Sequence, residues 1–367
     1  MKTASILALS ALGLVSASDE ANLEYAMAHL NAMLSKETVE YLESLDIPPH
    51  TQRYLDFLER KEKGLLHDDA FKTITQIANE NGFKCESHQV VTEDGYILGI
   101  YRIPGALVAG AEAEARPPVL LQHGLEADMM QWVYNRPEVA PALVLARAGY
   151  DVWLGNNRGT RWSNTHTKLD PKSKEYWSFD WEQMGTYDTP AVITKIKEVT
   201  GYDKVNYIGH SEGTSQIMAG AGLKPYNQFY HDNLNLAVFL APPACMSHNR
   251  VPIFNLLASD LNRQIITKAV ELLGMYNILP YNFINTTIAS TLCKLFDGKL
   301  CDLMMALVAD EDPTIDYTER YDVYMSNLPA GASYRNTVHY AQLINLPYEE
   351  FLRWDYESKE ENIKHYG

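Results

Sequence analysis

The stretch Gly209-His210-Ser211-Glu212-Gly213 decides the fold of this chain, because its glycines flank a serine between a strand-like and a helix-like segment. Residues 205–208 form a short apolar run that is typical of a buried strand, and residues 214–220 are small and apolar enough for a packed helix. The two glycines allow a sharp bend and a close approach of helix to strand. We therefore predict that the Ser211 hydroxyl stands exposed at the carboxyl end of the strand as a nucleophile. The alternative is a glycine-rich turn between ordinary elements.

Strands and helices alternate on both sides of this turn. Apolar runs at 119–125, 150–154 and 236–240 predict strands, and the patterns at 141–148 and 189–200 predict helices between them. Such alternation favours right-handed crossovers and a mostly parallel sheet. Ahead of it, residues 90–98 predict a hairpin with Asp94-Gly95 at its turn. We assign residues 66–244 to the first part of an α/β core.

The block from 245 to 327 interrupts the alternation. Its apolar spacing predicts helices throughout, and we expect this block to form a cap over the active-site face that binds acyl chains. Residues 328–367 are expected to start the C-terminal part of the core, with one helix over 334–346.

The first residues indicate the compartment. Lys2 precedes an apolar run from 4 to 15, and small residues before Ser18 predict a signal peptide over 1–17. Residues 18–65 predict a helical extension without evident chemistry. No later stretch has the length of apolar sequence that a spanning helix needs. We expect a protein of the secretory pathway, extracellular or lysosomal.

Composition excludes several classes of function. The chain has 367 residues and a formal net charge of −16, which argues against nucleic-acid binding. No spacing of His, Cys and acidic residues matches a zinc site, so we expect no metal and no cofactor.

The 4 cysteines fit an oxidising compartment without forming a disulfide scaffold. Cys293 and Cys301 are the candidate disulfide, and Cys85 and Cys245 are expected to be buried free thiols; the alternative is that all are reduced. The sequon at Asn285 predicts a surface glycan in a secretory protein.

A series of motifs in order resembles the acid lipases, the gastric and lysosomal acid lipases and their relatives among the α/β-hydrolases. The resemblance extends from about residue 66 to residue 366 and includes the turn around Ser211. Its other motifs are Val91-Thr92-Glu93-Asp94-Gly95-Tyr96-Ile97-Leu98, Leu121-Gln122-His123-Gly124-Leu125, Asp151-Val152-Trp153-Leu154-Gly155-Asn156-Asn157-Arg158-Gly159, Phe179-Asp180-Trp181-Glu182-Gln183-Met184, Leu240-Ala241-Pro242 and Leu328-Pro329-Ala330-Gly331-Ala332-Ser333.

The resemblance implies an α/β-hydrolase fold and a lipase that cleaves lipid carboxylic esters. It implies Ser211 as nucleophile and an oxyanion hole formed by the backbone N–H groups of Leu125 and Glu212. Family members usually carry glutamine at position 212. An ionised glutamate would oppose a developing oxyanion, so we expect its side chain to turn toward solvent or to be protonated in an acidic lumen.

The histidine base and its acid are not found in the sequence. In this fold they follow the serine in the order acid then histidine, each after a further strand, and residues 329–367 contain no such strand. The family's two residues lie beyond the segment that matches 362–367. We therefore expect a C-terminally truncated chain that lacks the last core strands and is nearly inactive.

Four local histidines are weak substitutes. His339 is expected to pack on a helix face, His248 to lie at the surface and His123 to support the oxyanion loop. His365 with Asp355 is sterically conceivable, but a frayed terminus is a poor place for a preorganised base.

Three hypotheses follow. The first is a lipase acting on triglyceride or cholesteryl ester at a lipid–water interface, of which this sequence is a truncated form and whose acid and histidine lie on two further strands. The second is a catalytically incomplete, lipase-like protein that binds lipid. The third is an incomplete chain that never folds stably, because an uncovered sheet edge invites aggregation.

Overall fold

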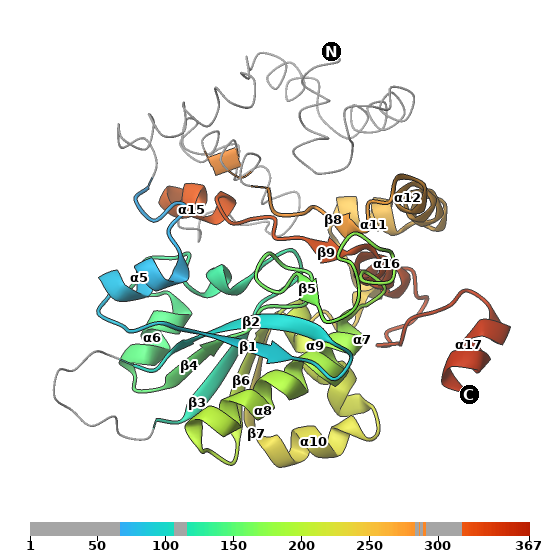
Figure 1. Cartoon of the computed structure of the whole chain (residues 1–367). Coiled ribbons are helices and arrows are strands. Elements are labelled where there is room, and N and C mark those ends of the chain that lie inside the picture. Colours follow the sequence, from blue (N-terminus) through green and yellow to red (C-terminus); the bar gives the residue numbers. More distant parts are fainter. Residues whose placement is uncertain (1–66, 106–115, 283–285, 287–288, 291–317) are drawn as a thin grey trace, which may run out of the picture.

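The computed structural model describes residues 67–105, 116–282, 286, 289–290 and 318–367 (Figure 1). The predicted signal peptide (1–17), the extension (18–65), the Asn285 sequon and the Cys293–Cys301 pair lie outside these residues. They remain predictions.

A seven-stranded sheet forms the centre of the fold, with strand order β1-β2-β4-β3-β6-β7 and β5 paired to β2. The pairs β4–β3, β3–β6 and β6–β7 are parallel, whereas β2 is antiparallel to β1, β4 and β5. The predicted α/β fold with a mostly parallel sheet is confirmed. The strands are β1 (Glu86–Val91), β2 (Tyr96–Ile103), β3 (Pro118–Gln122), β4 (Asp151–Leu154), β5 (Thr165–His166), β6 (Val205–His210) and β7 (Leu234–Leu240).

The hairpin of β1 and β2 forms where the sequence predicts it. Its register pairs Val91 with Ile97, and the turn between them contains Gly95 at φ +100°. A side chain at Gly95 would be strained at this φ and would place its Cβ 2.5 Å from Thr167 Oγ1. The turn therefore requires glycine at this position.

Helices cover both faces of the sheet (Figure 1). Successive side chains of β3 point to opposite faces, so Leu120 joins one buried cluster while Val119 and Leu121 join the other. Helices α8 and α9 pack into the first cluster, and α5 and α6 pack into the second. The helices of this core are α5 (Ile74–Glu80), α6 (Pro141–Arg147), α7 (Trp181–Gln183), α8 (Thr189–Thr200), α9 (Glu212–Gly222) and α10 (Tyr226–Asn233), with a 3-10 turn η1 (Met129–Trp132) and a π turn η2 (Met184–Asp188).

The block after β7 is not helical throughout, which corrects the prediction from sequence. Strand β8 (Asn277–Ile278) pairs antiparallel with β9 (Ala332–Ser333). Gly274 adopts φ +65° and ends α12, and Pro280 disfavours a helix at the residue before it, so no helix continues here. The other described elements of the block are η3 (Met246–His248), α11 (Pro252–Ala258), α12 (Asp260–Leu273), η5 (Thr318–Arg320) and α15 (Tyr321–Met325).

Helix α16 (Tyr334–Ile344) connects this block to the core. Helices α11 and α12 pack against α16, and Figure 1 shows the three together on one side of the molecule. The Tyr340 hydroxyl of α16 in turn donates a hydrogen bond of 3.1 Å to Ser215 Oγ in α9. The helix predicted over 334–346 is thus present and lies beside the helix that follows Ser211.

Strand β7 is the edge of the sheet among the described residues. Leu236 and Leu240 point to one of its faces and Phe239 to the other, and their exposed fractions are 56%, 41% and 37%. Both faces of β7 therefore leave apolar side chains uncovered by the described part of the chain.

Two further findings concern the cysteines and the membrane. Cys85 and Cys245 are free thiols, as expected, but neither is fully buried. Cys85 is partly exposed directly before β1, and Cys245 is exposed because it lies in the irregular segment after β7. None of the helices that the structure describes has the length and hydropathy of a membrane span.

Candidate active site

Ser211 occupies a strained turn between β6, which ends at His210, and α9, which begins at Glu212. Its backbone has φ +51° and ψ −118°, a conformation that non-glycine residues rarely adopt. The Ser211 N–H donates to the Leu240 carbonyl at 2.8 Å, and its carbonyl accepts from the N–H of Thr214 at 2.8 Å. Hydrogen bonds on both sides therefore hold the strained turn of a nucleophile elbow.

The flanking glycines have the steric role that the sequence predicts. A Cβ on Gly209 would lie 2.7 Å from the backbone of Gly213, and a Cβ on Gly213 would lie 2.5 Å from the carbonyl oxygen of Gln122. Backbone atoms cannot move aside as a flexible side chain could. These two positions therefore let α9 pack directly against β6 and the end of β3.

The loop after β3 reaches the same turn. A Cβ on Gly124 would lie 3.0 Å from Ser211 Cβ, so this loop contacts the nucleophile directly. The next residue, Leu125, makes no hydrogen bond through its N–H to any described group. Glu212 is the first residue of α9, so its N–H has no intrahelical acceptor. Two unpaired N–H groups beside a serine could receive a developing oxyanion, as proposed from the sequence.

His123 fixes the loop that carries Leu125. It is buried, its Nε2 accepts from the Asn157 N–H at 3.0 Å, and its Nδ1 therefore carries the proton that it donates to the Gly124 carbonyl at 2.8 Å. Burial lowers the pKa of His123 to about 4, which keeps the ring neutral. Both ring nitrogens are therefore engaged with backbone groups, and the ring serves as a structural connector.

The side chain of Glu212 points inward, which corrects the expectation that it turns toward solvent. It is 2% exposed and accepts hydrogen bonds from Asn157 Nδ2 at 2.9 Å and from Asn336 Nδ2 at 2.5 Å. The pKa of Glu212 is raised to about 7; burial is the largest cause and the charge of Asp180 adds to it, while the hydrogen bonds from Asn336 and Asn157 oppose the rise. The carboxyl is therefore protonated in an acidic compartment, the other condition that the sequence suggested.

Sequence reasoning missed a second carboxyl at this site, that of Glu126. Its backbone has φ +57°, its carbonyl accepts from the Ala330 N–H at 2.8 Å, and its Oε2 accepts from the Gly331 N–H at 3.1 Å. Burial raises the pKa of Glu126 well above its usual range, and the charge of Glu212 adds to this effect. Glu126 directly follows Leu125, the candidate for the oxyanion hole, and this position in the sequence could have indicated that it lies at the site.

His339 does not reach Ser211. Its Nε2 donates to the Leu352 carbonyl at 3.0 Å, its Nδ1 lies 3.6 Å from Asp180 Oδ1, and its ring stacks on Trp181 with centroids 4.1 Å apart. Although burial opposes it, the pKa of Asp180 falls to about 2 beside His339. His339 is thus a packed residue of the helix, as the sequence indicates.

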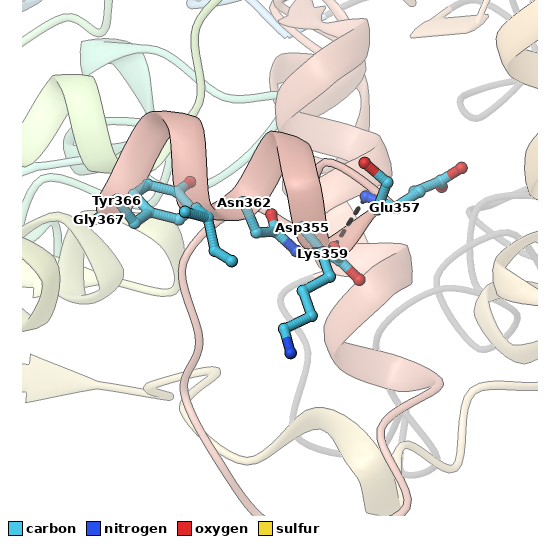
Figure 2. Close-up of a pocket in the computed structure, with 8 residues that line it drawn as sticks. Asp355, Glu357, Lys359, Asn362, Tyr366 and Gly367 are labelled. Atoms are coloured by element: carbon cyan, nitrogen blue, oxygen red, sulfur yellow. Dashed lines mark hydrogen bonds between the residues drawn. The ribbon is translucent and has the colours of Figure 1, made fainter.

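Asp355 and His365 do not form a pair. Figure 2 shows Asp355 in a pocket around helix α17 (Lys359–Tyr366), where its Oδ1 accepts from Asn362 Nδ2 at 2.7 Å. The ring of His365 instead stacks on the ring of Tyr356, with the ring centroids 3.9 Å apart. Ser211 does not line this pocket.

The described residues supply no base for the nucleophile. The hydroxyl of Ser211 makes no hydrogen bond within residues 67–105, 116–282 and 318–367. His248 lies at the surface, where its Nε2 is 2.8 Å from Glu349 Oε1. Within the same ranges no three His, Cys, Asp or Glu residues gather as metal ligands would.

Comparison with known proteins agrees with this geometry. Residues 74–136 match the family described as a partial alpha/beta-hydrolase lipase region, and residues 117–337 match the alpha/beta hydrolase fold. A lipase candidate from Sulfolobus solfataricus has a similar solved structure, with TM-score 0.51, 15% identity and coverage of 70% of this chain and 75% of that one. The protein is therefore an α/β-hydrolase.

Sequence relatives narrow the class. Lipase member K of Mus musculus is 36% identical over 84% of this chain and 75% of its own length. Gastric triacylglycerol lipase of Rattus norvegicus is 34% identical over 82% of this chain and 73% of its own length. The chain belongs to the acid lipase family, and its relatives and fold mark it as an ester-hydrolysing enzyme.

Proposed function

We propose that this protein hydrolyses carboxylic esters of lipids, of the triglyceride or cholesteryl ester type, with Ser211 as nucleophile. The observation that carries the proposal is the strained turn at Ser211, with the unpaired N–H groups of Leu125 and Glu212 beside it. The names of relatives such as gastric triacylglycerol lipase support a lipid ester as substrate.

The reaction follows from these groups. Ser211 Oγ attacks the ester carbonyl as its proton passes to a base, and the Leu125 and Glu212 N–H groups stabilise the oxyanion of the tetrahedral intermediate. The alcohol leaves with a proton and an acyl-enzyme remains. Water then attacks the acyl group, which releases the fatty acid and restores the serine. The histidine and acid that would move these protons are absent from the described residues.

The setting of the reaction is part of the same proposal. A leader over 1–17, a glycan at Asn285 and a disulfide between Cys293 and Cys301 would suit an extracellular or lysosomal enzyme. The block from 245 to 327 would cap the site and meet the lipid–water interface. Phe254 and Leu257, one helical turn apart on α11, are 36% and 44% exposed and could bind acyl chains there.

Hydrolysis of emulsified trioctanoin and cholesteryl oleate tests this function. Because the described residues supply no base, we expect turnover to be slow; the slow turnover should disappear in Ser211→Ala and persist in Ser178→Ala, which removes an exposed hydroxyl from a loop. Measurable turnover of equal rate in the protein and in Ser211→Ala would contradict the assignment.

A second candidate function is lipid binding without turnover. The observation that favours it is the Ser211 hydroxyl without a base among the described residues. A radiolabelled triether analogue of triglyceride separates the two. Tight binding of the analogue together with no hydrolysis of the ester would support a binding protein.

A further inference from the structure

The hydrogen bonds around the Glu212 carboxyl determine whether the end of the side chain at position 212 must donate or accept. On one side lies Asn157, in the loop after β4. Its Oδ1 accepts from Gln122 Nε2 at 2.5 Å and from Gln216 Nε2 at 2.8 Å. Two donors share that oxygen, and this arrangement leaves the Asn157 Nδ2 facing Glu212.

The other side of the carboxyl is fixed in the same way. Asn336 in α16 is fully buried, and its Oδ1 accepts from the Trp181 N–H at 3.0 Å. The Trp181 N–H lies at the start of α7, where it has no intrahelical acceptor. Turning the Asn336 amide would leave that buried N–H facing an NH₂ group. Its Nδ2 must therefore also face Glu212.

The side chain at position 212 consequently accepts two hydrogen bonds, and neither amide offers it an acceptor. A carboxyl group accepts at both oxygens, whereas a glutamine amide accepts at one end and donates at the other. Glutamine here would place its NH₂ against the NH₂ of Asn157 or of Asn336. An unmatched buried donor pair is costly.

We propose that Glu212 is the positioning residue of the oxyanion hole, through a double-acceptor carboxyl that joins the loop after β4 and helix α16 to the nucleophile turn. The bonds to Asn157 and Asn336 span 55 and 124 positions of sequence, so they connect distant segments at one residue. They hold the side chain of the same residue whose N–H faces the oxyanion. This inference rests on the function proposed above for Ser211.

The charge of the Glu212 carboxyl determines how well the neighbouring N–H groups can stabilise an oxyanion. The titratable groups that interact with it are the carboxyls of Asp180 and Glu126 and the phenols of Tyr207 and Tyr340. None of these is a cation. The ionised form therefore stands uncompensated beside the place where the oxyanion develops. The neutral acid accepts from one amide through its carbonyl oxygen and from the other through a lone pair of its hydroxyl, whose proton must point away from both amides; the nitrogen of a glutamine amide has no such lone pair to offer.

A swap of donor and acceptor tests the network. Glu212→Gln should lower the thermal midpoint by roughly 5 °C, because it opposes two donors. Adding Asn336→Asp should recover most of that loss, since a carboxylate at position 336 would accept from both the glutamine amide at position 212 and the Trp181 N–H. Glu198→Gln, at a side chain 63% exposed, is the matched control and should leave the midpoint unchanged. A double variant no more stable than Glu212→Gln would overturn the inference.

The rate of phosphonylation of Ser211 by a fluorophosphonate, measured at pH 5, tests the positioning role. Glu212→Gln should lose about 10-fold or more, and the double variant should regain most of it. Recovery of the thermal midpoint without recovery of the rate would overturn the positioning role. If Ser211 is not labelled in any form, the proposed function is what fails, and the thermal series alone decides whether the double-acceptor network exists.

Discussion

The turn at Ser211 is tightly packed and buried, whereas the segment after α16 is loosely packed and exposed. Around Ser211, backbone atoms approach so closely that Gly209 and Gly213 admit no side chain, and the buried amides of Asn157 and Asn336 meet at one carboxyl. From residue 345 to residue 367, most side chains are exposed or partly exposed, and the candidate pair Asp355 and His365 is not formed. The contrast is that the groups proposed to stabilise charge are held in place, while those that would transfer protons are absent from the described residues.

The largest expected effect concerns proton transfer. Because no described histidine reaches Ser211, we expect the 367-residue protein to react with a fluorophosphonate on the order of 10⁴-fold or more slowly than a serine hydrolase with its full triad. His339→Gln and His365→Ala should not slow it further. A stopped-flow or gel-based comparison of labelling rates measures this. A fast reaction that depends on either histidine would show that the C-terminal segment does supply a base for Ser211.

The next effect concerns the packing of the turn. Gly213→Ala should destabilise the fold by about 3 kcal/mol, since its Cβ would meet the Gln122 carbonyl oxygen at 2.5 Å. Gly222→Ala is the matched control, because a Cβ there meets nothing within 4 Å at the end of the same helix. That change should be neutral or slightly stabilising. Urea unfolding of both variants checks the pair, and equal free energies of unfolding would show that the turn is not tightly packed.

The pH dependence of the site is the third test. The folded-state pKa of Glu212 is raised to about 7 by burial, above its value in an unfolded chain, so its contribution to stability is present below about pH 4 and is lost as the pH rises through 7. The reaction of Ser211 should slow over the same range as the buried charge appears. The double variant Glu212→Gln with Asn336→Asp has no carboxyl at position 212, so its plot of rate against pH should lose the fall near pH 7. An unaltered profile would mean that another group controls it.

The smallest effect concerns the edge of the sheet. Leu236→Lys with Phe239→Lys places charges on both uncovered faces of β7 and should reduce self-association several-fold, with a change in thermal midpoint of no more than a few degrees. Sedimentation velocity at several protein concentrations measures it. If the protein is monomeric and the substitutions change nothing, the hypothesis of an unstable, aggregating chain loses its physical basis.

Local patterns in the sequence predict much of this fold. The alternating strands and helices, the hairpin turn at Gly95 and the helix over 334–344 all appear, because periodicity and turn chemistry are set by neighbouring residues. Strand β8 was missed because its pairing partner lies at 332–333, far along the chain. Helices α10 and α17 were not expected, and both are short polar segments with weak periodicity.

The site was predictable only in part. Ser211 and its neighbouring N–H groups follow from a local motif, but the direction of the Glu212 side chain depends on Asn336, 124 positions away. Glu126 was missed for a related reason, since its partners Ala330 and Gly331 lie about 200 positions further along the chain, beyond the block from 245 to 327. Long-range partners of this kind leave no periodic signal in one sequence.

The central claim is that Ser211 is the nucleophile, and mapping the site of phosphonylation tests it most directly. After prolonged treatment with a fluorophosphonate, peptide mass spectrometry should place the adduct on the peptide that contains Ser211. The adduct should be absent from Ser211→Ala and present in Ser178→Ala. An adduct of equal yield in Ser211→Ala, on any other residue, would contradict the account.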